Sequence, residues 1–529
     1  MRSFFSSSIL ASFGALATAV ALSCATYSDK NELMRRDLDR ANYDGALDEA
    51  NAALKVKKAK QMPRKYKKDT GLALLERATI LHALGDYELS ARDFAKAEEE
   101  LELLDIAKDA GGEIARWVYS ESAAKYTQPP SERLALNAIN LENYLMRGDL
   151  KGAKVEAKRF TVMRNYLLDH DPEHAYGEFG SYMAGFVFEK LGNADEAMRY
   201  YDEALMGRDF ATLQELIARL SKKSSVHTER LDAYSASGTA HGVKKEAKKE
   251  EAEPDKEEAA EDKAEGAESE AAQDAGAASD AETDEGAQTQ ESAEAGKDEP
   301  EVQKPGTEVV ALATAGGTGE LLVVVKLGRV PFKVPERIPI GAAIGIGAAY
   351  ITGDTTLLEQ GVLKFINYPE LVRAPHFFDD ARVEVDGRVV GSELASDLGK
   401  QIIREYEELK PRIIGAALTR MIARAATSAG IQAAGNAQSE KKENPTGALV
   451  GFLAALAVEG TMVALDKPDT RSWTTLPERV YIARTWLPAG THKVKISTVG
   501  PVDGVRSTKE LEVTIPDGGY AAVDFTTLR

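Results

Sequence analysis

Residues 185–205 read GFVFEKLGNADEAMRYYDEAL, and this stretch decides the fold of the N-terminal half. Apolar and aromatic residues recur at helical spacing on both sides of Gly192-Asn193, which is a turn signal. Small residues then stand at Ala197 and Ala204. Because small side chains let two helices approach closely, the stretch predicts two short helices packed against each other around a tight turn.

The same turn signal recurs along the N-terminal half. The loops are Ala41-Asn42-Tyr43, Gly85-Asp86-Tyr87, Gly148-Asp149-Leu150 and Gly192-Asn193-Ala194. Five residues after the first position of each loop comes a small residue, namely Ala46, Ser90, Ala153 and Ala197. This pattern resembles the tetratricopeptide repeat, which implies a solenoid of helix pairs. Phe160 departs from it, because the family has a small residue there.

The loops begin 44, 63 and 44 residues apart. These separations exceed the repeat of about 34 residues in the tetratricopeptide family. We therefore expect elongated units, with an extra helix pair at residues 101–126 in the longest interval.

In the tetratricopeptide family, the first helices of the units line a concave surface. Carried over to the last unit, the pattern places Phe179, Tyr182 and Phe186 there, as a candidate groove for an extended or helical peptide of a partner. The alternative interpretation is that these rings pack against a neighbouring helix, because aromatic residues at helical spacing usually belong to a core.

Residues 244–301 separate the two halves and contain no Val, Ile, Leu, Met, Phe, Tyr or Trp. Their 22 acidic residues and 7 lysines give a net charge of −15, out of −19 for the chain of 529 residues. Such a segment cannot bury enough apolar surface to offset its ordering entropy, and its like charges extend it. We predict a disordered acidic linker over residues 236–307. It is either a solvated spacer or a tether that binds a basic partner or divalent cations.

The only cysteine, Cys24, follows a short apolar stretch, residues 9–22, that begins after Arg2. A basic start before a short apolar run is typical of a secretory signal peptide. Ser23-Cys24 at its end resembles the lipobox of bacterial lipoproteins, in which the thiol is acylated and becomes the first residue of the mature chain. The alternative is simple cleavage after an A-x-A site within residues 17–21.

The position of Cys24 also limits the chemistry of the mature chain. With no further cysteine, that chain has no intramolecular disulfide, no thiolate metal cluster and no cysteine nucleophile. In Gram-negative lipoproteins, an Asp after the cysteine marks retention in the inner membrane, whereas Ala25 and Thr26 stand here. This resemblance favours the outer membrane, with the protein facing the periplasm.

After Gly319 the pattern changes to short alternating runs with Gly- or Pro-containing turns. These predict a small antiparallel sandwich. Residues 320–327 and 330–334 are expected to form a strand and its return strand, with Pro331 at an edge. A second hairpin is expected around Asp386-Gly387. The other candidate strands are residues 479–487, 491–497, 510–515 and 520–525.

Helix-like sequence lies between these strands and predicts a helical insert. Residues 394–409 and 413–434 have helical spacing, and Pro411 is expected to break the helix between them. Residues 448–465 are strongly apolar, but Glu459 near their middle is costly in lipid. The apolar residues 341–351 are too few to span a membrane. We expect buried helices or a hydrophobic surface for a partner.

No motif predicts an active site, a cofactor or a metal. His170 and His174 are the one pair of histidines with acidic neighbours, but Pro172 indicates a turn, with Asp171 as the N-cap of a helix. Gly345-Ile346-Gly347 lacks the third glycine and the acidic partner of a nucleotide site. We expect no catalytic, cofactor-binding or metal-binding residues, and we expect the chain not to be an enzyme.

Residues 55–68 carry eight Lys or Arg around Met62-Pro63. This run could contact lipid headgroups or other phosphates near the anchor. The alternative is a solvated loop between two helices. Nucleic acid is a poor partner for an exported chain with a net negative charge.

Three stretches resemble a family of uncharacterised bacterial outer-membrane lipoproteins. They are residues 132–159, residues 323–334 and the stretch from Asp469 and Trp473 to the Leu487-Pro488-Ala489-Gly490 turn. The family pairs tetratricopeptide-like repeats with a β-rich C-terminal region. Some relatives are thought to be encoded beside lipoprotein activators of peptidoglycan synthases, which implies a role in envelope assembly. The resemblance supplies no catalytic residues.

These observations predict an α-helical solenoid of tetratricopeptide type, joined by a disordered linker to an α+β domain. The expected parts are a signal peptide (1–23), the repeats (24–235), the linker (236–307) and the β-rich domain with its helical insert (308–529). We expect a lipid-anchored periplasmic scaffold that binds protein partners, with the linker letting the C-terminal domain reach across the periplasm. The alternatives are a glycan-binding or hydrolytic C-terminal module delivered by the repeats, and a subunit of an export or pore complex.

Overall fold

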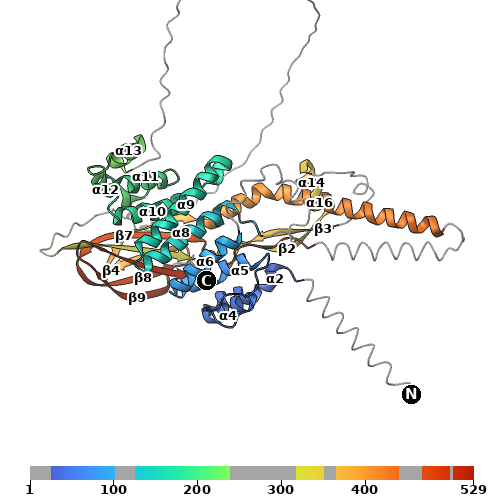
Figure 1. The fold of residues 1–529 in the computed structure, drawn as a ribbon, viewed down its shortest axis with the longest axis horizontal. Coiled ribbons are helices and arrows are strands. Elements are labelled where there is room, and N and C mark those ends of the chain that lie inside the picture. The colour runs from blue at the N-terminus through green and yellow to red at the C-terminus, as the bar shows by residue number, and fades with distance from the viewer. Residues whose placement is uncertain (1–24, 102–125, 239–316, 351–364, 440–466, 501–503) are drawn as a thin grey trace, which may run out of the picture. The chain divides into compact units, whose positions relative to one another are not determined.

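A computed structural model describes residues 25–101, 126–238, 317–350, 365–439, 467–500 and 504–529. An N-terminal helical region is followed by a β-rich C-terminal region (Figure 1). The described parts of both regions belong to one compact unit. The C-terminal region is therefore packed on the helices, and the expectation that it extends away from them is wrong. The predicted helix pair at 101–126 and the predicted linker lie almost entirely outside the described residues.

The helical region consists of consecutive helices that pack in pairs. The pairs are α3 (Glu32–Asp39) with α4 (Tyr43–Ala53), α5 (Thr70–Ala83) with α6 (Tyr87–Leu101), α8 (Pro130–Met146) with α9 (Leu150–His170), and α10 (Glu178–Lys190) with α11 (Ala194–Ala204). The remaining elements are α2 (Tyr27–Lys30), the 3-10 helix η3 (Pro172–His174), α12 (Ala211–Leu220) and α13 (Glu229–Ser237).

The turns within the pairs share one chemistry, which explains the recurring signal. The first residue of each turn has a positive φ, 57° at Ala41 and between 71° and 81° at the three glycines. The second residue caps the next helix, since Asn42, Asp149 and Asn193 each accept a hydrogen bond from the N–H three residues on. A left-handed residue ends one helix and an Asn or Asp begins the next. The four predicted turns are confirmed.

The small residues after the turns let the paired helices approach. All four are fully buried, as predicted: Ala46, Ser90, Ala153 and Ala197. Phe160, the exception in the pattern, is accommodated by Gly180 of α10, where an added Cβ would lie 2.1 Å from a ring carbon of Phe160. In this pair of helices the small residue stands on α10 instead of α9.

Three sheets form the C-terminal region. Sheet A has the order β10 (Tyr520–Thr527), β1 (Thr318–Leu327), β7 (Arg479–Pro488), β6 (Ser392–Asp397). Sheet B pairs β2 (Phe332–Pro339) with β3 (Phe365–Val372). Sheet C has the order β5 (Arg388–Val390), β4 (Asp380–Val385), β8 (Gly490–Val499), β9 (Val505–Ile515).

Sheet A is the middle layer of the molecule. On one side, Leu321, Val323 and other side chains share an apolar core with sheet C. On the other side, Leu322 and Val324 belong to the large core of the helical region. Strand β1 is therefore buried on both faces, because alternate residues of a strand point to opposite sides.

The strand pairing differs from the prediction in two respects. β1 pairs with β7 and, in parallel, with β10, so the expected return strand after β1 is wrong, as is an all-antiparallel sandwich. The chain leaves β1 at Gly328, with φ 67°, and β2 pairs with β3 instead. The hairpin at Asp386-Gly387 is confirmed: β4 pairs with β5, and both turn residues have positive φ.

The helical insert packs on sheet B. α14 (Ile340–Gly347) and α16 (Leu398–Ser439) share a small apolar core with β2 and β3. Pro411 lies inside α16 and does not end it, because buried residues anchor the helix on both sides, including Tyr406 and Ile414. In the described part of the chain, no helix is both long and apolar enough to cross a membrane. Residues 448–465 lie outside that part.

Candidate functional site

The first helices of three of the pairs face sheet A of the same chain. α5 and α8 contact β10, and α10 contacts β6. Phe186 packs edge-on against Tyr520 of β10, with ring centroids 5.4 Å apart. Phe179, Tyr182 and Phe186 are at most 6% exposed. These rings are core, as in the alternative interpretation, and do not line an open groove.

A buried charge cluster lies in this interface, centred on Lys326 of β1. Its ammonium donates to Glu142 Oε1 of α8 at 2.5 Å and also to Asp524 of β10. His82 of α5 stands beside both carboxylates, with Nε2 3.4 Å from Asp524 and 3.8 Å from Glu142. The cluster therefore joins two helices to two strands, and all four side chains are almost fully buried.

His82 is also bonded to the residue after Glu142. Its Nδ1 lies 2.8 Å from Asn143 Oδ1, and its Nε2 faces the two carboxylates. Burial raises the pKa of Glu142 to about 7, although Lys326 opposes the rise. Burial also opposes ionisation of Asp524, but Lys326 and His82 hold its pKa well below the usual range.

The same residues have the spacing of a metal site. Ligand atoms of His82, Glu142 and Asp524 all lie within 4.8 Å of one another. The Lys326 ammonium bonds both carboxylates from within the chain. A metal ion would have to displace that ammonium, so the arrangement fits an internal cation better than a bound one.

A second cluster is centred on Arg484 of β7. Its guanidinium donates to Glu320 of β1 and to Glu189 of α10, the latter at 2.6 Å, and lies 4.9 Å from the centre of the Phe186 ring. Lys190 also donates to Glu320. Burial alone would raise the pKa of Glu189, but Arg484 and Lys190 lower it to about 2. This cluster fixes α10 on the sheet.

The segment of residues 470–476 is held by carboxylates of the first helices. Glu76 of α5 accepts hydrogen bonds from Thr474 N and Oγ1 at 2.9 Å each and from Thr475 N at 2.8 Å. Glu132 of α8 accepts from Trp473 N at 3.2 Å. Burial raises the pKa of Glu76 and raises that of Glu132 to about 7. The segment is thus bonded to two helices through acidic groups whose pKa values are raised by burial.

Helix α16 is joined to α8 in the same way. Glu405 accepts from the Ser131 N–H at 2.8 Å and from Ser131 Oγ at 2.9 Å. Ser131 lies in the first turn of α8, where unpaired N–H groups favour an acidic partner. Burial raises the pKa of Glu405 to about 8.

These partners were not predicted from the sequence, although one signal points to them. Glu320, Lys326 and Arg484 stand in largely apolar strands. A charged residue is rarely fully buried unless it is paired. The resembling stretches also meet here, since Glu142 bonds Lys326 and Glu132 bonds Trp473.

The histidines singled out from the sequence lie elsewhere. His170 ends α9, with Nδ1 2.8 Å from Tyr166 O and its ring stacked on Tyr166. His174 lies in η3, with Nδ1 2.8 Å from Asp171 Oδ1 and Nε2 3.1 Å from Glu408 of α16. Asp171 precedes this short 3-10 helix, but its side chain makes no capping hydrogen bond. The two rings have separate partners.

A polar cavity of about 240 Å³ opens where β6 meets α16 and α10. Its carboxylates are already bonded to groups of the same chain. Asp397 accepts from the Lys400 N–H at 2.9 Å and pairs with the Lys400 ammonium at 3.1 Å. Glu178 accepts from the Gly177 N–H at 3.2 Å. Both carboxylates bond near the first residues of their own helices.

No protein-family model matches the chain, and a search of curated proteins found no match either.

Proposed function

We propose that this chain is a lipid-anchored scaffold of the bacterial envelope. It is attached through Cys24 to the outer membrane, faces the periplasm and binds protein partners in envelope assembly through helical repeats of tetratricopeptide type. Partners bind the outward face of the repeats, because sheet A of the same chain covers the inner face.

The observation that carries the proposal is the packing of the chain directly after Cys24. Thr26 and Asp29 form a capping box at α2. The Ser28 N–H donates to Thr470 Oγ1 at 3.0 Å, and Ser28 is 2% exposed. A chain that starts at Cys24 keeps all these contacts. They hold the body close to an acylated residue, which suits a platform fixed at a membrane.

The outer surface of the repeats supports partner binding. Val155 and Val162 of α9 are 51% and 54% exposed. Residues seven apart lie two turns apart on one face of a helix, so the two valines form an apolar pair there. Apolar positions at this spacing are typical contacts for a partner helix.

Intact mass and membrane fractionation of the mature protein, with and without Cys24→Ser, test the anchor. We expect the mass of a diacyl or triacyl chain that starts at Cys24, and release of the Cys24→Ser variant from the membrane. A mature N-terminus at another residue, or no release, would overturn the anchor.

Site-specific photo-crosslinking in cells tests the scaffold. A photoreactive residue replaces Val162, and the matched position is Val389 of β5, which is 65% exposed in the C-terminal region. We expect one reproducible protein adduct at Val162 and none at Val389. Adducts at Val389 alone would place the partner on sheet C, and adducts at neither position would contradict a scaffold of this geometry.

A further inference from the structure

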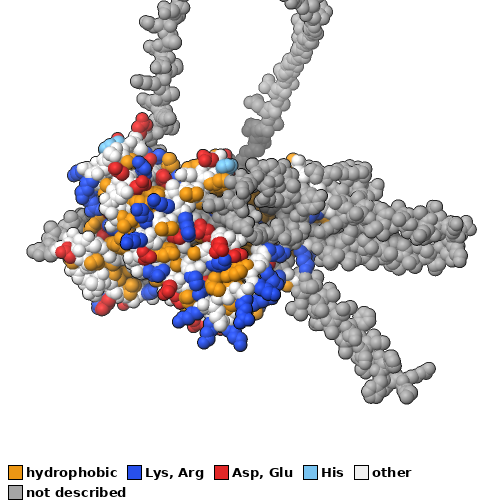
Figure 2. All heavy atoms as spheres, viewed as in Figure 1, with side chains coloured by type: hydrophobic (Ala, Val, Ile, Leu, Met, Phe, Trp, Pro, Cys, Tyr) orange, Lys and Arg blue, Asp and Glu red, His pale blue; other side chains and the backbone are white. Residues whose placement is uncertain are grey.

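The loop between α4 and α5, residues 55–68, is strongly basic. It contains eight Lys or Arg and no acidic residue. All eight are exposed: Lys55, Lys57, Lys58, Lys60, Arg64, Lys65, Lys67 and Lys68. Figure 2 shows Lys and Arg side chains gathered on the side where Figure 1 draws α2 and α4.

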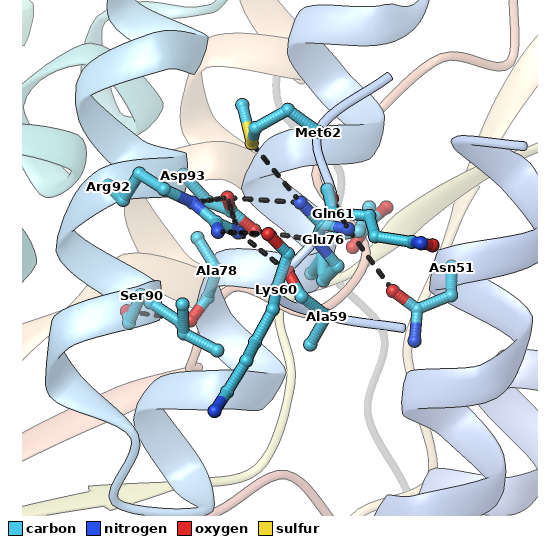
Figure 3. Close-up of polar contacts among 12 residues, drawn as sticks. Asn51, Ala59, Lys60, Gln61, Met62, Glu76, Ala78, Ser90, Arg92 and Asp93 are labelled. Atoms are coloured by element: carbon cyan, nitrogen blue, oxygen red, sulfur yellow. Dashed lines mark hydrogen bonds and ion pairs between the residues drawn. The ribbon is translucent and has the colours of Figure 1, made fainter. Parts of the chain in front are cut away.

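The backbone of this loop is held by a buried ion pair. Arg77 of α5 and Asp93 of α6 are fully buried, with Nε and Oδ2 2.6 Å apart. Arg77 donates to Gln61 O at 3.1 Å, and Arg92 donates to Lys60 O at 3.0 Å and to Ala59 O at 2.7 Å (Figure 3). Two arginines thus bind three consecutive carbonyl groups of the loop.

This arrangement separates the apolar side chains of Met62 and Pro63 from the exposed basic side chains of the loop. Pro63 is buried and Met62 Sδ lies 3.6 Å from Arg77, whereas the Lys60 side chain points away from the bonded groups in Figure 3. A loop fixed on its inner side presents its ammonium groups together. A solvated connection between helices needs no such support, because its backbone groups could bond to water.

The loop and the first described residues of the chain contact the same helix, α5. Tyr27, three residues after Cys24, donates to Glu76 at 3.5 Å, and the next residue of α5 is Arg77, which holds the loop. Asp69, at the end of the loop, bonds Arg471 of the segment that also binds Ser28. The first packed residues of the chain and the basic loop are therefore bound by neighbouring residues of α5.

We propose that residues 55–68 bind the anionic phospholipid headgroups of the leaflet that carries the anchor. The position of this leaflet rests on the proposed lipid attachment, whereas the headgroup binding itself does not need the acyl chains. Lys and Arg near an anionic membrane attract it over about a Debye length. The chain as a whole carries −19, so such binding must come from a local surface.

The test uses the mature chain with Cys24→Ser, which carries no acyl group and keeps every described residue. Its co-sedimentation is measured with vesicles of phosphatidylglycerol and phosphatidylethanolamine, and with vesicles of phosphatidylcholine. We expect binding to the anionic vesicles alone, and loss of that binding when salt is raised.

Two variants with the same change in net charge locate the surface. The loop variant replaces Lys57, Lys58, Lys60 and Lys65 with Gln, and the control variant replaces Lys151, Lys158, Lys222 and Lys223, which are also exposed. We expect the loop variant to partition about a hundredfold less than the parent, and the control to change by less than about threefold.

The outcomes separate this proposal from the anchor. Equal loss in both variants, or no binding by the parent chain, overturns headgroup binding, whatever the mass of the acylated protein shows. Binding to an acidic polymer without binding to vesicles also overturns it, in favour of a soluble polyanion. If the intact mass shows no acyl group at Cys24, but vesicle binding is still lost in the loop variant alone, the anchor is overturned and headgroup binding is supported.

Discussion

The two faces of strand β1 hold sheet A to its neighbours by different means. Toward sheet C, the residues are apolar and share one core: Leu321, Val323, Val325 and Leu327. Toward the helices, Leu322 and Val324 lie between Glu320 and Lys326, and both charges are paired with groups from the helices. Apolar contact has no direction, whereas a buried charge is tolerated only where its partners meet it. We infer that the charges select one register of the helices on the sheet.

The largest effect is expected when the Lys326 cluster loses its cation. Lys326→Met leaves Glu142 and Asp524 buried without the ammonium that bonds both. Breaking a buried ion pair from one side costs roughly 3 to 5 kcal/mol, because the remaining charge is uncompensated. Urea denaturation followed by circular dichroism measures the change in the free energy of unfolding.

A second variant shows whether the cost comes from the stranded charge. Adding Asp524→Asn to Lys326→Met removes the carboxylate whose pKa is held low, and should restore part of the lost stability. If the double variant instead has a lower free energy of unfolding than Lys326→Met, lost packing rather than the uncompensated charge explains the first result.

The next largest effect is the pH dependence of the helix–sheet interface. The pKa values of Glu132 and Glu405 rise from an ordinary 4.5 to about 7 and about 8, because both are buried. The folded state then binds more protons than the unfolded state, so the free energy of unfolding falls as pH rises through this range. For Glu132 alone, the shift corresponds to roughly 3 kcal/mol.

Thermal unfolding between about pH 5 and pH 8 checks this sign, with Glu405→Gln as the informative variant. Gln keeps an oxygen for Ser131 but does not titrate, so the decline with pH should be shallower. The matched control is Glu407→Gln, since Glu407 is exposed on the same helix. A steeper decline in Glu405→Gln, or equal slopes in both variants, would argue against buried protonated carboxylates.

The apolar face should respond less. Val323 is 1% exposed and stands opposite Val523 and Ala483 in the core with sheet C. Val323→Ala removes two methyl groups and leaves a small cavity, which costs roughly 2 kcal/mol. The loss should be the same at pH 5 and pH 8, because the one ionisable side chain among the residues of that core is Tyr481, and burial raises its pKa to about 12. A pH-dependent loss would mean that the two faces are coupled.

Local features were predictable from the sequence, and long-range partners were not. A Gly followed by Asn or Asp ends one helix and caps the next, so the turn at Gly192 follows from its own residues. The partners of Lys326 come from segments near residues 142 and 524, and no residue close to Lys326 in the sequence indicates which segments they are. The parallel pairing of β1 with β10 cannot be inferred from the residues of either strand for the same reason. Pro411 does not break α16 as predicted, because the buried contacts on both sides outweigh the tendency of proline to end a helix.

The smallest effect is expected for an ion pair of the same kind on the outer side of sheet C. Lys495 of β8 stands opposite Glu510 of β9, with Nζ and Oε1 3.8 Å apart and side chains 43% and 73% exposed. Lys495→Met makes the same chemical change as Lys326→Met, but water solvates the remaining carboxylate. The free energy of unfolding should change by less than about 0.5 kcal/mol. A loss as large as that of Lys326→Met would show that strand charges matter wherever they lie, and burial would no longer explain the difference between the two faces of β1.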